Sequence, residues 1–273
     1  QLGGGCGSGT LYTMGQGQVD MLLTLLFFIV GATIGSSHLG WWHGLGDVGT
    51  ISLIKDYGWL PALLMTLIIL IGLYLLVVFL DKRKNQQLKP VFTPVPRSKF
   101  VATLLFGKWP LWWAVIGLAI FNLLTLLTAG HPWSITFAFS LWGTKFWSAI
   151  GGDISSWSYW QQPYLQQVLN SSVLLDNTSV MDFGLILGAG LAAALTGRFA
   201  PATKMTKNKW FAVIVGGLLL GYGARLAFGC NIGALLAGIS SGSVHGWLWL
   251  VSGFIGNIAG TRLRVVIGLD KPY

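Results

Sequence analysis

The sequence contains little charge and no glutamate. Only 9% of its 273 residues are charged, against roughly 25% in soluble domains, and all eight acidic residues are Asp. Hydrophobic residues make up 53% of the chain, and the mean hydropathy is +0.67. This composition excludes an ordinary soluble protein. We predict an all-α polytopic membrane protein that forms one transmembrane domain over residues 1–273.

Cysteine and the usual catalytic motifs are scarce too. The chain has two cysteines and four scattered histidines, which lack the spacing of zinc ligands. It contains no nucleophilic triad, phosphate-binding loop or paired carboxylates. The net charge is +9. The basic residues that cause it flank apolar stretches and are not interleaved with aromatic side chains, which argues against nucleic-acid binding. We therefore predict no metal, no cofactor and no catalytic residue.

Six apolar stretches are long enough to cross about 30 Å of hydrocarbon. They cover residues 19–37, 59–80, 111–129, 180–199, 210–228 and 244–263. Lys and Arg gather between the second and third stretches, after the fourth, and at the end, so these segments are predicted to be cytoplasmic. They include a basic loop at 81–109. An aromatic segment at 131–178 is predicted to lie at the outer interface without crossing.

A glycine-cysteine phrase occurs twice in the chain. With an offset of 224 residues, Gly5, Cys6 and Gly9 fall on Gly229, Cys230 and Gly233, and after one insertion Gly17, Gly31 and Gly35 fall on Gly242, Gly256 and Gly260. We therefore predict a first cysteine repeat at 1–80 and a second at 110–273. The charge map makes them antiparallel, as in the inverted-topology repeats of transporters. The first repeat is incomplete, because the chain opens inside its motif, and we expect a preceding segment in the native protein.

The segments around the cysteines are too short to span the membrane. Their glycine and hydroxyl content favours re-entrant half-helices, whose free N–H groups and dipole attract an anion. A thiol beside such a helix start prefers a soft, sulfur-containing solute. The predicted binding residues are Cys6, Cys230, Gly5, Gly229, Asn231 and Arg225. Buried cysteines also serve as small packing residues, and that alternative stays open.

Three other features have competing interpretations. Arg225 lies in an apolar stretch and either attracts the anion toward Cys230 or braces the re-entrant loop. Asp20 is interpreted as a helix-start cap and Asp182 as an interface residue. The GxxxG pairs at 31/35 and 256/260 are interpreted as close helix packing.

The phrases GGGCGSGTLYTMG and GARLAFGCNIGALLAGISSGSVHGW closely resemble the YeeE/YedE family of bacterial inner-membrane sulfur-compound transporters. The resemblance covers nearly the whole chain. It implies an all-helical fold with a narrow path, and Cys6 and Cys230 match the family's repeat cysteines, which contact thiosulfate through thiol hydrogen bonds. It also implies association with TusA-like or rhodanese-like cytoplasmic sulfur carriers.

These features predict uptake of thiosulfate or a related sulfur anion, without a covalent step. One alternative is a membrane sulfurtransferase that forms a cysteine persulfide and passes the sulfur to a carrier. Another is a structural membrane scaffold with packed cysteines. Some family members are linked to selenium, so the resemblance implies the substrate only as a class.

Overall fold

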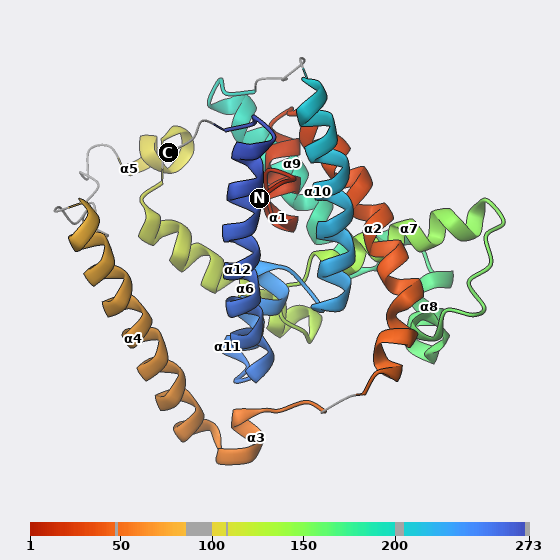
Figure 1. Cartoon of the computed structure of the whole chain (residues 1–273), viewed down its shortest axis with the longest axis horizontal. Coiled ribbons are helices and arrows are strands. Elements are labelled where there is room, and N and C mark those ends of the chain that lie inside the picture. The colour runs from red at the N-terminus through yellow and green to blue at the C-terminus, as the bar shows by residue number, and fades with distance from the viewer. Residues whose placement is uncertain (47–48, 86–99, 108, 200–204, 271–273) are drawn as a thin grey trace. The chain divides into compact units, whose positions relative to one another are not determined.

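The computed structural model describes residues 1–46, 49–85, 100–107, 109–199 and 205–270 (Figure 1). Its helices, in chain order, are α1 (Gly7–Gly15), α2 (Val19–Gly44), α3 (Leu53–Tyr57), α4 (Trp59–Asn85), α5 (Phe100–Phe106), α6 (Leu111–Ala129), α7 (Thr136–Ala149), η2 (Ser158–Gln161), α8 (Pro163–Asn170), η3 (Val173–Leu175), α9 (Asn177–Leu195), α10 (Lys207–Leu226), η4 (Asn231–Leu236), α11 (Ala237–Ser240) and α12 (Val244–Val266). Within the described ranges the one strand-like pairing is an isolated bridge between Ser52 and Ser243. The prediction of an all-α chain is confirmed. Most of the predicted basic loop at 81–109 lies outside the described residues.

Five described helices are long and apolar enough to cross a membrane. They are α2, α4 up to Lys84, α6, α9, and the continuous stretch Lys207–Ser240 that α10 begins. The polytopic membrane fold is thus confirmed. The sixth predicted span forms α12, which has 23 residues but a less apolar sequence with two arginines near its end. Its crossing of the membrane stays a prediction.

The chain folds into two compact units. Unit 1 comprises residues 1–49, 133–237 and 246–273, and unit 2 comprises 50–132 and 238–245. These units describe packing and do not test the predicted repeat boundaries. Both cysteines belong to unit 1, so the candidate site lies within a single unit.

Helices α2 and α10 form the centre of unit 1. Gly217 packs against Thr24, and Gly221 against Phe28 and Ala32. A Cβ atom at Gly217 would lie 2.7 Å from the Cβ of Phe27, so glycine lets the two backbones approach closely. Because residue numbers rise together along this contact, α2 and α10 run in the same direction.

The first GxxxG pair belongs to this contact and the second does not. Gly31 lies against Leu218, and Gly35 against Arg225, which confirms the packing interpretation. In α12, by contrast, a Cβ at Gly256 would have no described atom within 4 Å, whereas Gly260 packs against Gln1. Only one member of the second pair is thus in a close contact.

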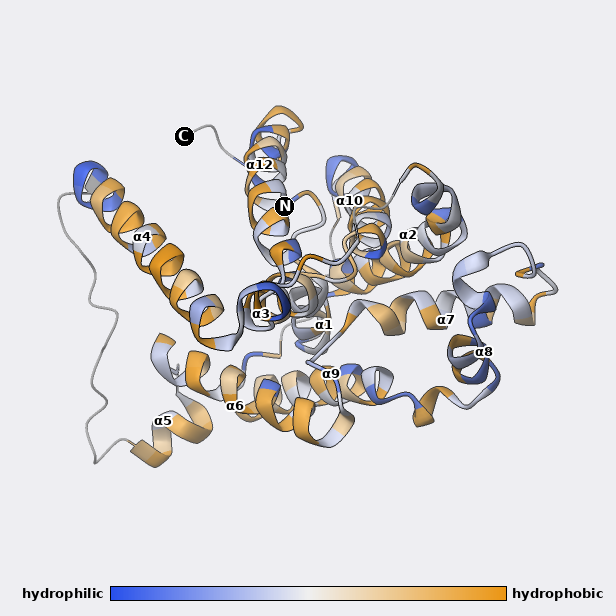
Figure 2. Cartoon of the chain, turned by 90° about the horizontal axis from the view of Figure 1, so that it is seen from below, coloured by the Kyte–Doolittle hydropathy of each residue, from blue (hydrophilic) through white to orange (hydrophobic). Residues whose placement is uncertain are grey.

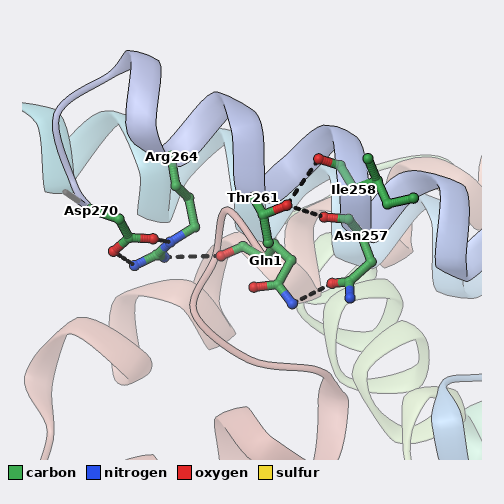
Figure 3. Close-up of polar contacts among 6 residues, drawn as sticks. All are labelled: Gln1, Asn257, Ile258, Thr261, Arg264 and Asp270. Carbon is green, nitrogen blue, oxygen red and sulfur yellow. Dashed lines mark hydrogen bonds and ion pairs between the residues drawn. The ribbon is translucent and has the colours of Figure 1, made fainter. Parts of the chain in front are cut away.

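Helix α12 runs antiparallel to α10. Near its end the side chain of Asn208, at the start of α10, donates to the carbonyl of Ile267 over 2.7 Å. Farther back along α12, Asn257 contacts Gln1, and Arg264 donates to the Gln1 carbonyl over 3.0 Å (Figure 3). The helices that follow the two cysteines, α2 and α12, therefore run in opposite directions.

Helix α7 is short and largely buried. Its 14 residues extend over about 21 Å, too little to cross the hydrocarbon. The hydroxyls of Ser140 and Ser36 are 2.5 Å apart, and the rings of Phe139 and Phe28 pack edge to face at 4.8 Å. The segment thus supports α2 as a core helix of unit 1. Its depth at the outer interface stays a prediction.

Unit 2 contains α3 to α6 and the turn at 238–245. The turn is fixed to the segment before α3, because Leu53 N–H donates to the Gly242 carbonyl over 2.8 Å and Val244 N–H to the Ile51 carbonyl over 3.2 Å. Nearly all described residues of α4 and α6 are at least partly exposed, and the buried ones are Ala62 in α4 and Thr125 in α6. Figure 2 shows α4 as hydrophobic along most of its length. Such surfaces suit contact with lipid.

Candidate functional site

The two cysteines occupy the same position in two short helices. Cys6 is the N-cap of α1, with φ −87° and ψ −174°, and Cys230 is the N-cap of η4, with φ −110° and ψ −160°. The carbonyl of each accepts the first helical hydrogen bond over 2.8 Å, from Thr10 N–H and Ala234 N–H respectively. Neither thiol caps its own helix. The half-helices therefore begin directly after the cysteines, so each thiol lies beside a helix start.

The backbone around the cysteines is repeated as well. Two residues before each cysteine lies a left-handed residue, Gly4 at φ +83° and Phe228 at φ +52°. After each helix comes a left-handed glycine, Gly17 at +96° and Gly242 at +68°. Left-handed backbone is costly for a bulky side chain, so Phe228 keeps the conformation in spite of its residue type. The sequence repeat is thus also a repeat of local structure.

Both cysteines line one cavity of about 170 Å³ in unit 1. Its other lining residues are Gly7, Phe28, Leu219, Leu220, Gly223, Ala224, Gly229, Asn231 and Trp249. A water molecule has a share of about 30 Å³ in the liquid, and drug-sized ligands need at least about 300 Å³. The cavity therefore fits a small ion or molecule. Its lining has no Lys, Arg or His, so a charged ligand would rely on thiols, the Asn231 amide and backbone groups.

The starts of both half-helices converge on one thiol. The backbone N–H groups of Ile232 and Gly233, in η4, and of Ser8, in α1, interact with Cys230. The hydroxyl of Ser8 also lies 3.3 Å from the Cys6 sulfur. Cys230 is buried, Cys6 is half-buried, and both are free thiols. The N–H groups at the starts of two helices thus face this end of the cavity, which favours a negatively charged ligand.

The absence of a side chain at Gly7 keeps the space beside Cys230 open. A Cβ at Gly7 would lie 3.5 Å from the Cys230 sulfur and 3.3 Å from a methyl carbon of Thr136. Any larger side chain would enter the cavity or displace α7. Gly7 was not among the predicted binding residues, although it directly follows the first cysteine.

The structure brings four of the six predicted binding residues to the cavity: Cys6, Cys230, Gly229 and Asn231. Gly5 is not in the lining and packs against the backbone of Gly9. Arg225 is also outside the lining: its guanidinium carbon lies 4.1 Å from the centre of the Tyr159 ring. Burial raises the pKa of Tyr159, although the charge of Arg225 acts in the opposite sense.

The prediction for Asp20 is wrong. The N-cap of α2 is Gln18, and Asp20 instead forms an ion pair with Lys209 of α10 at 2.6 Å. Asp182 is fully buried within the protein, and its place at the membrane interface stays a prediction. Neither arrangement has a local signal in the sequence, since both depend on packing between helices far apart in the chain.

A second cavity of about 160 Å³ lies at the start of α2 and α10. Lys209 and Arg264 line it, but both have acidic partners: Lys209 pairs with Asp20, and Arg264 donates to Asp270 over 2.6 Å (Figure 3). Both cations of this cavity are thus already paired, and neither cysteine lines it.

The cavity residues that the sequence analysis missed are Gly7 of α1, Phe28 of α2, four residues of α10 and one of α12. Leu219, Leu220, Gly223 and Ala224 recur at helical spacing on one side of α10, and Trp249 comes from α12. Their periodicity predicts a buried helix face, but it does not distinguish a face that lines a cavity from one that packs.

Comparison with known proteins gives this site a family context. Residues 1–259 match the protein family described as Sulphur transport. The chain belongs to the Sulphur transport family. The matched range includes both cysteine half-helices and all the residues that line the first cavity.

Individual relatives agree with this Sulphur transport membership. The chain is 29% identical over 278 residues to the thiosulfate transporter TsuA of Spirochaeta thermophila, covering 94% of this chain and 71% of the relative. It is 26% identical over 260 residues to TsuA of Escherichia coli K12, covering 93% and 68%. The probable transporter YedE of the same organism is 28% identical over 153 residues, but this chain spans only 37% of its length.

Proposed function

We propose that this chain carries thiosulfate or a related sulfur-containing anion across the bacterial inner membrane into the cytoplasm. The observation that carries the proposal is the shared cavity of Cys6 and Cys230, with the starts of two half-helices directed at one thiol. The Sulphur transport family and the names of the two TsuA relatives support the substrate class.

The chemistry of the cavity suits a soft anion. Backbone N–H groups at the starts of α1 and η4 offset negative charge without binding it as firmly as a lysine or arginine. The thiols of Cys6 and Cys230 donate weak hydrogen bonds. Such soft donors suit the sulfur atom of the anion, which is itself a soft and weak acceptor. A site built of many weak contacts releases its ion quickly, as transport requires.

Opposite helix directions support an inverted repeat. Helix α2, after Cys6, runs with α10, whereas α12, after Cys230, runs against it. Together with the repeated backbone at the two cysteines, this is the arrangement that alternating access around a central site uses. We propose that the two half-helices form the two sides of that site.

The proposed activity needs no covalent step and makes the chain a transporter without enzymatic activity. A persulfide carried by Cys6 or Cys230 would instead indicate sulfur transfer to a cytoplasmic TusA-like or rhodanese-like carrier. Mass spectrometry of protein purified with thiosulfate distinguishes them, because a persulfide adds one sulfur atom to the cysteine.

Uptake of ³⁵S-thiosulfate by proteoliposomes that contain the full-length protein tests the proposal. We expect uptake above that of empty liposomes, reduced at least about tenfold by Cys6→Ala or Cys230→Ala. Phe137→Leu serves as a control variant, because Phe137 packs in a different hydrophobic cluster around Trp160. Undiminished uptake by both cysteine variants would contradict the proposal.

A further inference from the structure

Helix α9 carries an acid that the proposed site does not use. Asp182 has no exposed surface, and neither carboxylate oxygen has a hydrogen-bond partner among the described residues. The other buried aspartate of the described chain is Asp20, which pairs with Lys209. Asp182 is therefore a buried carboxyl group without a compensating charge.

Asp182 lies between the polar start of α9 and the hydrophobic core of unit 1. One turn before it, Ser179 accepts a hydrogen bond from the indole of Trp142 over 2.8 Å. One turn after it, Ile186 packs against the core cluster that contains Cys230. The start of α9, Asn177, is about 7–8 Å away along the helix axis. The charge pattern predicts that this start faces the outside.

No cation from the elements packed on α9 reaches Asp182. Lys145 of α7 donates to the carbonyls of Leu169 and Ser171. Tyr12 of α1 is half exposed. Asp176, the N-cap of α9, acts on Asp182 with a charge of the same sign. Cys6, at the start of α1, is the other titratable group on these elements and carries no positive charge.

Physical chemistry then limits what Asp182 does in this conformation. An ionised carboxylate without partners in a low-dielectric interior costs several kcal/mol. The sealed conformation therefore holds the neutral acid, and ionisation requires that water reach the side chain. Gly15 of α1 lies against the carbonyl of Ile186, one turn after Asp182, so α1 covers this part of α9 and would have to move for water to enter from the core side. That movement would also shift Cys6, at the start of α1.

Uptake of a dianion needs an energy source. Each negative charge that enters a cell with a negative interior costs about 2.3 kcal/mol per 100 mV. The sequence contains no ATP-binding motif. Movement of cations together with the anion is then the simplest way to offset the cost.

We propose that Asp182 is a proton-binding site that couples uptake of the sulfur anion to proton entry, an inference that rests on the proposed function. The carboxylate takes one proton from outer water, which permits the sealed conformation. It returns that proton to inner water when α1 and α9 separate. One proton that enters with each thiosulfate dianion reduces the transported charge from two negative to one.

The test uses the full-length protein in proteoliposomes with the membrane potential clamped at zero. A gradient of one pH unit, acid outside, is expected to raise the final internal ³⁵S-thiosulfate concentration up to about tenfold above the external one. An internal pH dye is expected to report proton entry with thiosulfate. Asp182→Asn should still equilibrate thiosulfate but neither concentrate it nor move protons.

A matched control is Asp153→Asn, because Asp153 is exposed and its carboxylate bonds within its own loop, to Ser155 and the backbone of Ile154. It should keep the wild-type response to the pH gradient. If wild-type protein equilibrates thiosulfate but the gradient neither concentrates it nor drives proton entry, the coupling is wrong and the proposed function stands. If a sodium gradient drives accumulation in its place, or if Asp182→Asn keeps the full response, the assignment is also wrong.

Two further outcomes are decisive. Wild-type protein that moves no thiosulfate under any gradient overturns the proposed function and the coupling together. If Asp182→Asn fails to reach the membrane, Asp182→Glu and the wild-type proton flux replace it. The Asp182→Glu protein should keep proton-coupled accumulation. The inference is overturned if this variant equilibrates thiosulfate but has lost the coupling. It is also overturned if the wild-type protein shows no proton flux.

Discussion

The ammonium of Lys209 lies 2.6 Å from a carboxylate oxygen of Asp20, and it joins the first turns of the parallel helices α2 and α10. The two ends of this pair differ in exposure: the Asp20 side chain is 4% exposed and that of Lys209 is 40% exposed. Removal of the lysine leaves a buried charge without a partner, whereas removal of the charge from Asp20 leaves a lysine that water still solvates.

This asymmetry gives the first prediction. Lys209→Met should lower the free energy of unfolding by about 1–3 kcal/mol and Asp20→Asn by less. Melting temperatures of the detergent-purified protein measure both. Lys207 is an exposed lysine two residues earlier, and Lys207→Met should change the melting temperature little. The double variant should be more stable than the sum of the single effects predicts. Equal losses for Lys209→Met and Lys207→Met would show that the ion pair contributes nothing.

The second prediction concerns the glycines that bring α2 and α10 together. Gly217→Ala would place a Cβ 2.7 Å from the Cβ of Phe27 and 2.8 Å from the carbonyl oxygen of Thr24, and backbone at that distance does not yield easily. We expect a destabilisation of about 1–3 kcal/mol. Gly256→Ala makes the same chemical change at an open position in α12 and should be neutral or stabilising by up to about 1 kcal/mol. Thermal unfolding of both variants, monitored by the loss of the helical circular dichroism signal, measures their stabilities. A Gly217→Ala protein more stable than the Gly256→Ala protein would contradict the assigned packing.

How much the sequence could predict depends on how local the cause of each feature is. Short helices after Cys6 and Cys230 were predicted correctly, because glycine-rich segments too short to cross the membrane have few other solutions. Their re-entry into the membrane stays a prediction. The left-handed backbone at Gly17 and Gly242 follows from glycine at matched positions. Phe228 adopts the same conformation as Gly4 with a residue type that does not favour it, so no residue preference predicts it.

Contacts between distant helices had no such local signal. A lone aspartate near a helix start fits a cap, a dipole partner or an ion pair equally, and only the position of Lys209 decides among them for Asp20. Arg225 was expected either to attract the anion or to brace the re-entrant loop, because it lies in an apolar stretch five residues before Cys230. The helix directs its side chain to Tyr159 of the 131–178 segment instead, and that direction depends on how this segment folds back onto α10.

The third prediction tests the cavity beside Cys230. Gly7→Val fills the space in which a Cβ already approaches the Cys230 sulfur at 3.5 Å, and it should raise the KM for thiosulfate uptake by about tenfold or abolish uptake. Gly184→Val is the matched control, because no described atom lies within 4 Å of its Cβ position on α9. Uptake kinetics in proteoliposomes measure both. A Gly7→Val protein with unchanged kinetics would exclude this cavity from the transport path.

The fourth prediction separates the two interpretations of Arg225. Its guanidinium stacks on Tyr159 and is buried, so Arg225→Lys should lose the planar contact and lower stability by about 1 kcal/mol. Because Arg225 does not line the cavity, the KM for thiosulfate should change by less than about twofold. Tyr159→Leu removes the other half of the contact and should reproduce the loss of stability, again with little effect on KM. If Arg225 instead attracts the anion, Arg225→Met would raise the KM many-fold, while Tyr159→Leu would leave the KM unchanged. Measurement of the melting temperature and the KM on the same preparations distinguishes the two roles, even when a variant is partly unfolded.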